Sequence, residues 1–337
     1  MRESNKTTEI ILPNRIGDSV LSLPALLCLK QLQNKYNKNR EITIYPPFHF
    51  FEVIWSFKLF ETKLLEEISK VHSWFSPADE TFFLSTSYKS LGIRTQKSYG
   101  ENIQAKPLLK YNVDLPYLSI TKTEEYLSPN LVEYLRTNFG FSIATIRIFG
   151  ILKEMGYSEK QIIETFQFDN NSLELQVDEL NTWSPTLAKN NYLVCCMEAA
   201  YGRKREAKRR WDESNYIELA EKLHRETSLL TVFVGTDTSY KIPQTLKSQQ
   251  SLIDLRGKLT LVQLTQLIRH SKAYYGNDTG PLHIANLMKR PSIGIYLSTD
   301  PKDYGPIFKD LNKAIIKPQS LEKVSEELIS SIQLQKV

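Results

Sequence analysis

The strongest constraint on the fold comes from one stretch in the C-terminal half of the chain. An apolar run at 273–275 ends in the turn 276–280 (GNDTG), and an amphipathic run begins at Pro281. Proline at a first helical position, preceded by Asp and Thr, is typical of a helix start. A second apolar run, 293–297, follows Pro291 and predicts another buried strand. The stretch therefore predicts a strand, a tight turn, a short helix and a strand.

The turn before this helix has two interpretations. Its backbone N–H groups and the positive end of the helix dipole suit an anion such as a diphosphate, and His283 would lie one turn into the helix, within reach of it. The alternative is that Asn277 to Gly280 form only a helix cap, for which Asn, Asp and Thr are common. Asp-Thr-Gly also matches an aspartic-protease triplet, but the sequence has no second copy and a strand-to-helix setting is wrong for it.

The second half of the chain alternates apolar runs with helical periodicity. We expect strands at 192–197, 229–234, 252–255, 273–275 and 293–297, with helices at 216–226, 261–270 and 281–288 between them. This alternation predicts βαβ units, a parallel sheet and helices on both of its faces. A last amphipathic helix is expected at 320–334.

The first half begins with a short apolar strand at 9–12, a turn at 14–18 and a helical run. Pro24 is expected near the first turn of that helix, with Ser22 as a candidate cap. Asp18 then lies at the carboxyl edge of the first strand, where open α/β sheets place their chemistry. On position alone, capping of the helix is the competing role for Asp18.

The rest of the first half is less regular. Strands are expected at 41–45 and 80–84, helices at 50–65 and 143–155, and Gly156 is expected to close the second helix in the C′ position. The chain then turns polar, and we place a domain boundary near 175–190. Basic residues at 94–110 are expected to be solvated surface, with an anionic acceptor site as the alternative.

A basic loop, 201–211 (YGRKREAKRRW), follows the first strand of the second half. A run this basic is usually a solvated face, and it could also imitate an RNA-binding patch. Aromatic residues are not interleaved to stack bases, and no RNA-binding motif accompanies the loop, so we expect no nucleic-acid partner.

Composition limits the class of protein. The chain has 337 residues, 41% of them hydrophobic and 24% charged, which suits a globular protein with two α/β domains. No apolar run approaches the ~20 residues of a membrane span, and the polar start lacks the apolar core of a signal peptide, so we expect a cytoplasmic protein. The three cysteines match no metal spacing and are expected to be buried thiols. The net charge of +5 is mildly basic and favours phosphate-bearing substrates or contact with the inner membrane face.

Two separated motifs carry a family resemblance. The C-terminal motif consists of Asp278-Thr279-Gly280, His283, Ala285, Pro291, Thr299-Asp300-Pro301 and Gly305-Pro306. The N-terminal motif consists of Arg15-Ile16-Gly17-Asp18-Ser19-Val20, Pro24-Ala25-Leu26 and Lys30. Together they resemble family 9 glycosyltransferases, the lipopolysaccharide heptosyltransferases.

The resemblance implies a GT-B fold, with two Rossmann-like domains facing each other across a cleft. The expected divisions are 1–180 for the acceptor domain, 181–320 for the nucleotide-sugar donor domain and 321–337 for a helix crossing back to the first domain. It implies inverting transfer of a heptose-like sugar, with ADP-L-glycero-D-manno-heptose as the expected donor, to a hydroxyl of a lipopolysaccharide core or related glycan. No Asp-x-Asp element lies near either motif, so metal-independent transfer without a cofactor is expected.

The resemblance also implies roles for single residues. Asp18 would be the catalytic base. The donor-binding residues would be Lys208, Arg209, Asp278, Thr279, Gly280 and His283, and the acceptor side would include Arg15, Gly17 and Ser87. Asp278 is itself anionic, so backbone N–H groups or sugar hydroxyls suit it better than phosphate.

The chain departs from the family pattern at two places. Glu198-Ala199-Ala200 replaces Pro-Gly-Ala, which puts an acid near the expected diphosphate, and Leu297 replaces a glycine. Either change could redirect or weaken an enzyme. Two rival functions therefore stay open: a non-catalytic or decayed nucleotide-sugar binder, and a sugar-nucleotide epimerase of the same architecture, for which only Asp18 is clearly placed.

Overall fold

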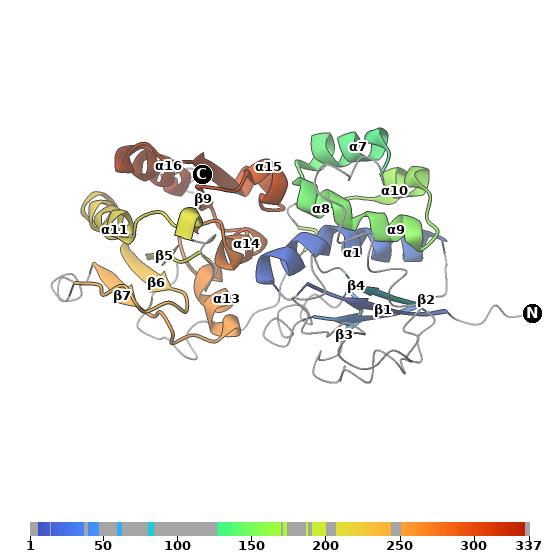
Figure 1. The fold of residues 1–337 in the computed structure, drawn as a ribbon, viewed down its shortest axis with the longest axis horizontal. Coiled ribbons are helices and arrows are strands. Elements are labelled where there is room, and N and C mark those ends of the chain that lie inside the picture. The colour runs from blue at the N-terminus through green and yellow to red at the C-terminus, as the bar shows by residue number, and fades with distance from the viewer. Residues whose placement is uncertain are drawn as a thin grey trace, which may run out of the picture. The chain divides into compact units, whose positions relative to one another are not determined.

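The computed structural model describes residues 6–13, 15–36, 40–46, 59–62, 80–83, 127–169, 171–173, 187, 191–199, 207–243 and 251–333. The chain divides into two compact units, 1–175 and 176–337, against an expected boundary near 175–190. Figure 1 draws the first unit in blue and green and the second in yellow to red. Within the described ranges, no helix combines the length and the apolar character needed to cross a membrane.

The first unit contains a parallel sheet with strand order β3-β2-β1-β4. Its elements are β1 (Lys6–Ile11), α1 (Ile16–Tyr36), β2 (Arg40–Tyr45), β3 (Glu61–Thr62), β4 (Glu80–Phe83), α7 (Pro129–Phe139), α8 (Ile143–Ile148), α9 (Gly150–Glu154) and α10 (Glu159–Thr165). Helix α1 packs against α8 and α10. The central strand β1 leads directly into α1, which places the N-terminal motif at the carboxyl edge of the sheet.

Helix α1 begins earlier than the sequence predicts. It starts at Ile16, so Pro24 lies inside the helix rather than in its first turn, and Ser22 is no cap but donates its hydroxyl to the carbonyl of Asp18. An interior proline removes one backbone hydrogen bond and typically costs ~3 kcal/mol. The helix tolerates it because one side of α1, including Val20, Leu23 and Leu26, is fully buried.

Two further expectations for this unit were wrong in detail. The helix expected at 50–65 lies mostly outside the described residues, and where it is described, Glu61–Thr62 pairs with β2 as a strand. The helix expected at 143–155 is two helices, because the hydrogen bonds around Phe149 tighten to three-residue spacing where its ring packs against Phe141 and Phe166. Gly156 closes the second one as expected, with φ of +82°.

The second unit is a six-stranded parallel sheet of order β10-β9-β8-β5-β6-β7. Its strands are β5 (Tyr192–Cys196), β6 (Leu230–Val234), β7 (Leu252–Asp254), β8 (Ala273–Asn277), β9 (Ser292–Tyr296) and β10 (Asn312–Ile316). Its helices are η7 (Ala207–Arg209), α11 (Glu213–Thr227), α13 (Leu261–Arg269), α14 (Gly280–Leu287), α15 (Pro301–Tyr304), η8 (Lys309–Leu311) and α16 (Leu321–Gln333). The predicted strands and helices are confirmed to within a few residues, and β10 is an addition.

Helices cover both faces of this sheet. Alternate strand residues such as Cys195, Tyr275 and Ile295 share one buried cluster with the apolar sides of α11 and α16. On the other face, α14 contacts β8 and β9 and packs against α13. The apolar side of α16 thus lies in the core of its own unit, and a return of this helix to the first unit stays a prediction.

The order of the strands reverses beside β5. From β5 the chain proceeds through β6 to β7 at one edge, returns to β8 on the other side of β5, and continues through β9 to β10. Open parallel sheets bind ligands outside the carboxyl ends of the strands at such a reversal. Met197 and Glu198 follow β5 there, and Asp278 follows β8.

Candidate functional site

The turn after β8 centres on a buried carboxylate, that of Asp278, whose side chain is only 5% exposed. Nη2 of Arg209 lies 2.8 Å from Oδ2 of Asp278 and also donates to its main-chain oxygen at 2.8 Å. The hydroxyl of Thr299 donates to the same Oδ2 at 2.7 Å. On the other side, Nε2 of His283 lies 3.8 Å from Oδ1. Three side chains from three parts of the chain thus meet at one carboxylate.

These neighbours keep the carboxylate ionised. Burial alone would raise the pKa of Asp278, but the His283 ring, the Thr299 hydroxyl and the Arg209 guanidinium outweigh burial and hold this pKa below its ordinary value. Asp278 is therefore an anion at neutral pH that orients Arg209, and within the described residues its carboxylate is bound by side chains rather than by the backbone N–H groups of its own turn.

The guanidinium of Arg209 is not fully hydrogen-bonded. Its side chain is 25% exposed. Its Nε–H is buried and has no hydrogen-bond partner among the described residues. His283 resembles it in this respect, because the ring is 4% exposed and its Nδ1 is also without a partner in the described part of the chain. Unpartnered buried polar atoms are uncommon in folded proteins, so these two call for a functional account.

The capping interpretation of the turn is not supported. Thr279 is the N-cap residue of α14, but its side chain makes no capping hydrogen bond and instead donates to the carbonyl of Asn277 at 3.3 Å. The carboxylate of Asp278 is engaged by Arg209 and Thr299. The first turn of α14, with Gly280 and Pro281 at its start, is thus left without a side-chain cap.

The three described cations of the basic loop differ in their surroundings. The structure describes residues 207–211 of the loop, and a short 3-10 helix there ends at Arg209. Lys208 is exposed, and Arg209 turns to Asp278. Arg210 turns to Asp237 at 2.9 Å and lies 3.6 Å from Glu213, so its charge is already matched by two acids. Arg209 is the cation of this group that is both ordered by a partner and incompletely hydrogen-bonded.

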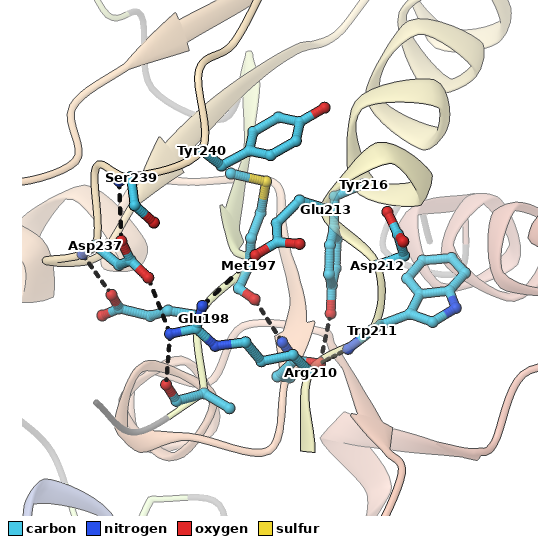
Figure 2. Close-up of polar contacts among 12 residues, drawn as sticks. Met197, Glu198, Arg210, Trp211, Asp212, Glu213, Tyr216, Asp237, Ser239 and Tyr240 are labelled. Carbon is cyan, nitrogen blue, oxygen red and sulfur yellow. Dashed lines mark hydrogen bonds and ion pairs between the residues drawn. The ribbon is translucent and has the colours of Figure 1, made fainter. Parts of the chain in front are cut away.

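Glu198, the acid that departs from the family pattern, is bound by backbone donors (Figure 2). Its carboxylate accepts the N–H of Thr236 at 2.9 Å and the N–H of Asp237 at 2.7 Å, both in the turn after β6. Gly235 allows this approach: its φ is +128°, and a Cβ there would lie 2.8 Å from Cδ of Glu198. The negative charge is thereby compensated at the β6 turn.

A small, open recess lies beside this carboxylate. It lies at the carboxyl ends of β5 and β6 and is lined by Met197, Glu198, Arg210, Glu213, Val234, Asp237, Tyr240 and Arg256. The aromatic ring of Tyr240 lies next to the Met197 side chain, and the carboxylates of Glu213 and Asp237 flank them (Figure 2). Tyr240 and Met197 thus give the recess an apolar surface, and the carboxylates of Glu213 and Asp237 provide hydrogen-bond acceptors at its sides.

The N-terminal motif lies in the first unit. Asp18 is in the first turn of α1 and is partly exposed, Gly17 precedes it in the same turn, and Arg15 is exposed just before the helix. Ser19 fixes the start of the helix by donating its hydroxyl to the carbonyl of Pro13 at 2.6 Å. Ser87, expected on the acceptor side, lies outside the described residues. The three described residues thus share one helix start.

Sequence reasoning missed Asn277 and Asp237 as site residues and left Thr299 as a motif residue without a contact. Asn277 precedes the motif Asp, so its place in the turn was visible, but its three partners were not. The three cysteines are confirmed as buried free thiols, and burial raises the pKa of Cys196 to about 12. In the described ranges, no group of three metal-binding side chains occurs.

Comparison with known sequences settles the family. Residues 122–330, more than half of the chain, match the profile of glycosyltransferase family 9 (heptosyltransferase). The chain belongs to glycosyltransferase family 9. Within that family, the Asp278 turn, His283 and Arg209 all fall inside the matched region, whereas Asp18 lies before it.

Curated family 9 relatives match part of the chain. Lipooligosaccharide heptosyltransferase 2 of Haemophilus influenzae is 31% identical over 109 residues, which cover 30% of this chain and 31% of that protein. Lipooligosaccharide heptosyltransferase 2 of Campylobacter jejuni is 25% identical over 152 residues, covering 41% and 47%. The chain thus matches less than half of the length of these relatives.

Solved structures of this family match nearly the whole chain. Escherichia coli ADP-heptose lipopolysaccharide heptosyltransferase II has a TM-score of 0.67 at 18% identity, covering 98% of this chain and all of that one. An E. coli heptosyltransferase bound to ADP has a TM-score of 0.58 at 14% identity, covering 96% and 99%. These similarities show that the fold is GT-B, as the sequence motifs imply.

Proposed function

We propose that this glycosyltransferase moves a heptose-like sugar from a nucleotide-diphosphate sugar, with ADP-heptose as the donor, to a hydroxyl of a lipopolysaccharide core or a related glycan. Family membership supports the reaction class. The names of the relatives support the sugar, because several are lipopolysaccharide or lipooligosaccharide heptosyltransferases. The donor nucleotide is supported by a structural relative that was solved with ADP.

One observation carries the donor half of the proposal: among the described residues the Arg209 guanidinium bonds only through Nη2, to Asp278, while its side chain stays 25% exposed. A diphosphate beside it would accept from the accessible N–H groups of the guanidinium, and charge-assisted bonds of this kind are about twice as strong as neutral ones. The uncapped first turn of α14 follows directly and adds backbone donors and a favourable dipole.

We place the nucleoside part of the donor at the recess beside Glu198. The recess is open and far smaller than the ~300–1,000 Å³ of whole-ligand pockets, so a nucleoside would lie over it rather than inside it. A base could lie on Tyr240 and Met197, and the carboxylates of Glu213 and Asp237 could accept from ribose hydroxyls. Arg210, which lines the recess, is adjacent in sequence to Arg209, so the two subsites would join.

For the chemical step we propose Asp18 as the general base. The acceptor oxygen forms a bond to the anomeric carbon while its proton passes to the Asp18 carboxylate. The bond between the anomeric carbon and the diphosphate oxygen breaks on the opposite face, and the leaving diphosphate takes the electron pair. Arg209, Lys208 and the start of α14 would stabilise the charge that develops there, and such a stabilisation usually makes the largest contribution to catalysis.

A decayed binder is the second candidate, because Glu198-Ala199-Ala200 replaces the Pro-Gly-Ala of the family. The deciding experiment begins with a thermal-shift panel of ADP-, GDP-, UDP- and CMP-sugars. Ligand at about 100 times its dissociation constant adds ~2.7 kcal/mol of apparent stability. Transfer to an acceptor glycan is then measured for wild type, Asp18→Asn and the control Asp169→Asn, an exposed turn aspartate of the same unit.

We expect an ADP-sugar to stabilise all three proteins equally and Asp18→Asn alone to lose about 10²–10⁴ in rate. Binding without transfer by the wild type would favour the decayed binder. Near-normal turnover by Asp18→Asn would make Asp18 a structural residue.

A further inference from the structure

Asn277, the last residue of β8, is fully buried and has three hydrogen-bond partners from two other segments. Its side-chain nitrogen donates to the carbonyl of Met197, at the end of β5, at 2.6 Å. Its side-chain oxygen accepts the hydroxyl of Tyr216 at 2.8 Å and the backbone N–H of Trp211 at 3.2 Å. These contacts fix the orientation of the amide, because a flipped amide would set its NH₂ against the N–H of Trp211 and its oxygen against the carbonyl of Met197.

The bond to Trp211 links this amide to the basic loop. Trp211 is two residues beyond Arg209, and Asn277 directly precedes Asp278. Consecutive residues at the end of β8 therefore hold two points of the same loop, the N–H of Trp211 and the guanidinium of Arg209. The indole of Trp211 is also packed edge-on against Tyr216, with ring centroids 5.0 Å apart.

We propose that Asn277 is a positioning residue. By bonding to the N–H of Trp211 it anchors the basic loop and thereby holds the guanidinium of Arg209 in position beside Asp278. Without this anchor the loop loses its backbone bond to the end of β8, and only the packing of Trp211 and the contacts of Arg210 hold the chain after Arg209. The guanidinium would therefore be placed less closely relative to Asp278. The proposal rests on the proposed donor site for its effect on ADP, but the placement of Arg209 can be measured without any nucleotide.

The chain offers a matched control in Asn286. This asparagine is also fully buried in the second unit and also bonds to backbone through both ends of its amide. It donates to the carbonyl of Phe308 at 2.7 Å and accepts the N–H of Phe308 at 2.8 Å. Its loss should destabilise the fold in a similar way, but its partner is not in the basic loop.

The first readout is the rate at which phenylglyoxal modifies Arg209 in the folded protein, followed by mass spectrometry. We expect Asn277→Ala to raise this rate severalfold over wild type and Asn286→Ala to leave it unchanged. An equal rate in Asn277→Ala and wild type would overturn the proposal. Asn277→Ser, which keeps a polar group at the site, gives the same test if the alanine variant does not fold.

The second readout is ADP affinity by calorimetry. Asn277→Ala should weaken binding roughly tenfold, a loss of ~1.4 kcal/mol. In the double variant Asn277→Ala/Arg209→Ala, affinity should equal that of Arg209→Ala within about twofold, because residues that act through one another are not additive. Independent, additive losses would contradict the proposal. If wild type binds no ADP while Arg209 reactivity still rises in Asn277→Ala, the positioning holds and the proposed function fails.

Discussion

Arg209 and Asp278, 69 positions apart in the sequence, form an ion pair in which one nitrogen, Nη2, contacts both the carboxylate and the main-chain oxygen of the acid at 2.8 Å. The acid therefore orients the arginine. Because Nη2 serves both acceptors, Nη1 of the partly exposed guanidinium keeps its donors for a ligand, whereas the Nε–H is buried.

Replacing Arg209 with alanine should weaken ADP binding by about 1.5–3 kcal/mol, the value of a hydrogen bond to a charged group. The neighbouring Lys208→Ala is the matched comparison. Lys208 is exposed, and an exposed charge typically contributes only ~0–1 kcal/mol, so a smaller loss is expected. Calorimetry on both variants checks this, and equal affinities of wild type and Arg209→Ala would remove the basic loop from the donor site.

Glu198→Ala should lower stability more than it changes affinity. The carboxylate accepts the backbone N–H groups of Thr236 and Asp237, and its loss leaves both donors without their partner. Because water can reach this turn, we expect a decrease of about 0.5–1.5 kcal/mol in the free energy of unfolding, measured by denaturant titration. A large gain in ADP affinity instead would mean that the acid repels the diphosphate despite its backbone partners.

Acid should weaken the second unit through Asp278. The folded pKa of this carboxyl lies below its ordinary value, so the folded state favours the ionised form. Its contribution is therefore present above the unfolded pKa of about 3.9 and is lost as pH falls through the folded value. In Asp278→Asn the free energy of unfolding should fall less steeply below about pH 4 than in wild type. Parallel pH profiles for the two proteins would contradict this.

Gly276→Ala should be strongly destabilising, because the added Cβ would lie 2.5 Å from the backbone carbonyl oxygen of Cys196 on the neighbouring strand. Overpacking typically costs ~1–3 kcal/mol, and a backbone atom cannot move aside as a side chain can. Gly294→Ala is the comparison, because its Cβ would meet only side-chain atoms of Leu282 and Tyr296. Thermal unfolding should show the larger loss for Gly276→Ala; the reverse order would refute the argument.

Ser228→Gly should stabilise the protein. Ser228 ends α11 with φ of +59°, a left-handed conformation that costs a residue with a side chain about 1–2 kcal/mol. Glycine removes this strain but loses more backbone entropy on folding, so the net gain should be about 0.5–1 kcal/mol. The melting temperature checks the sign. Ser228→Ala, which keeps a Cβ, should show no such gain.

The sheet of the second unit could be predicted because its signals are local. Each inner strand is a short apolar run beside a helix of clear period, as at 230–234 and 292–296. The edge strand β10 was not predicted because Asn312 and Lys313 make its start polar. In the first unit, Pro24 led to a predicted helix start that is too late in the sequence. The helix accepts Pro24 in its interior because burial of α1 outweighs the local preference of a proline.

Site residues that belong to a sequence motif could be predicted. Contacts between site residues from distant parts of the chain could not. Arg209, Asp278 and His283 were expected in one place, and the structure brings them together. The partners of Glu198 lie 38 and 39 positions away, in a turn that meets it only because β5 and β6 are neighbours. Which strands are neighbours is a property of the whole sheet, so a single sequence could not supply it.

The reversal of strand order beside β5 has a kinetic consequence. Met197 and Asn277 are bonded across 80 positions, and they meet only when β8 has docked beside β5. Contacts between distant positions form slowly, whereas helices such as α11 and α13 can form early from neighbouring residues. During refolding, the spectroscopic signal of the helices should therefore return before the ion pair between Arg209 and Asp278 forms. Newly made chains would pass through a stage in which much of the secondary structure is present and the nucleotide has nowhere to bind.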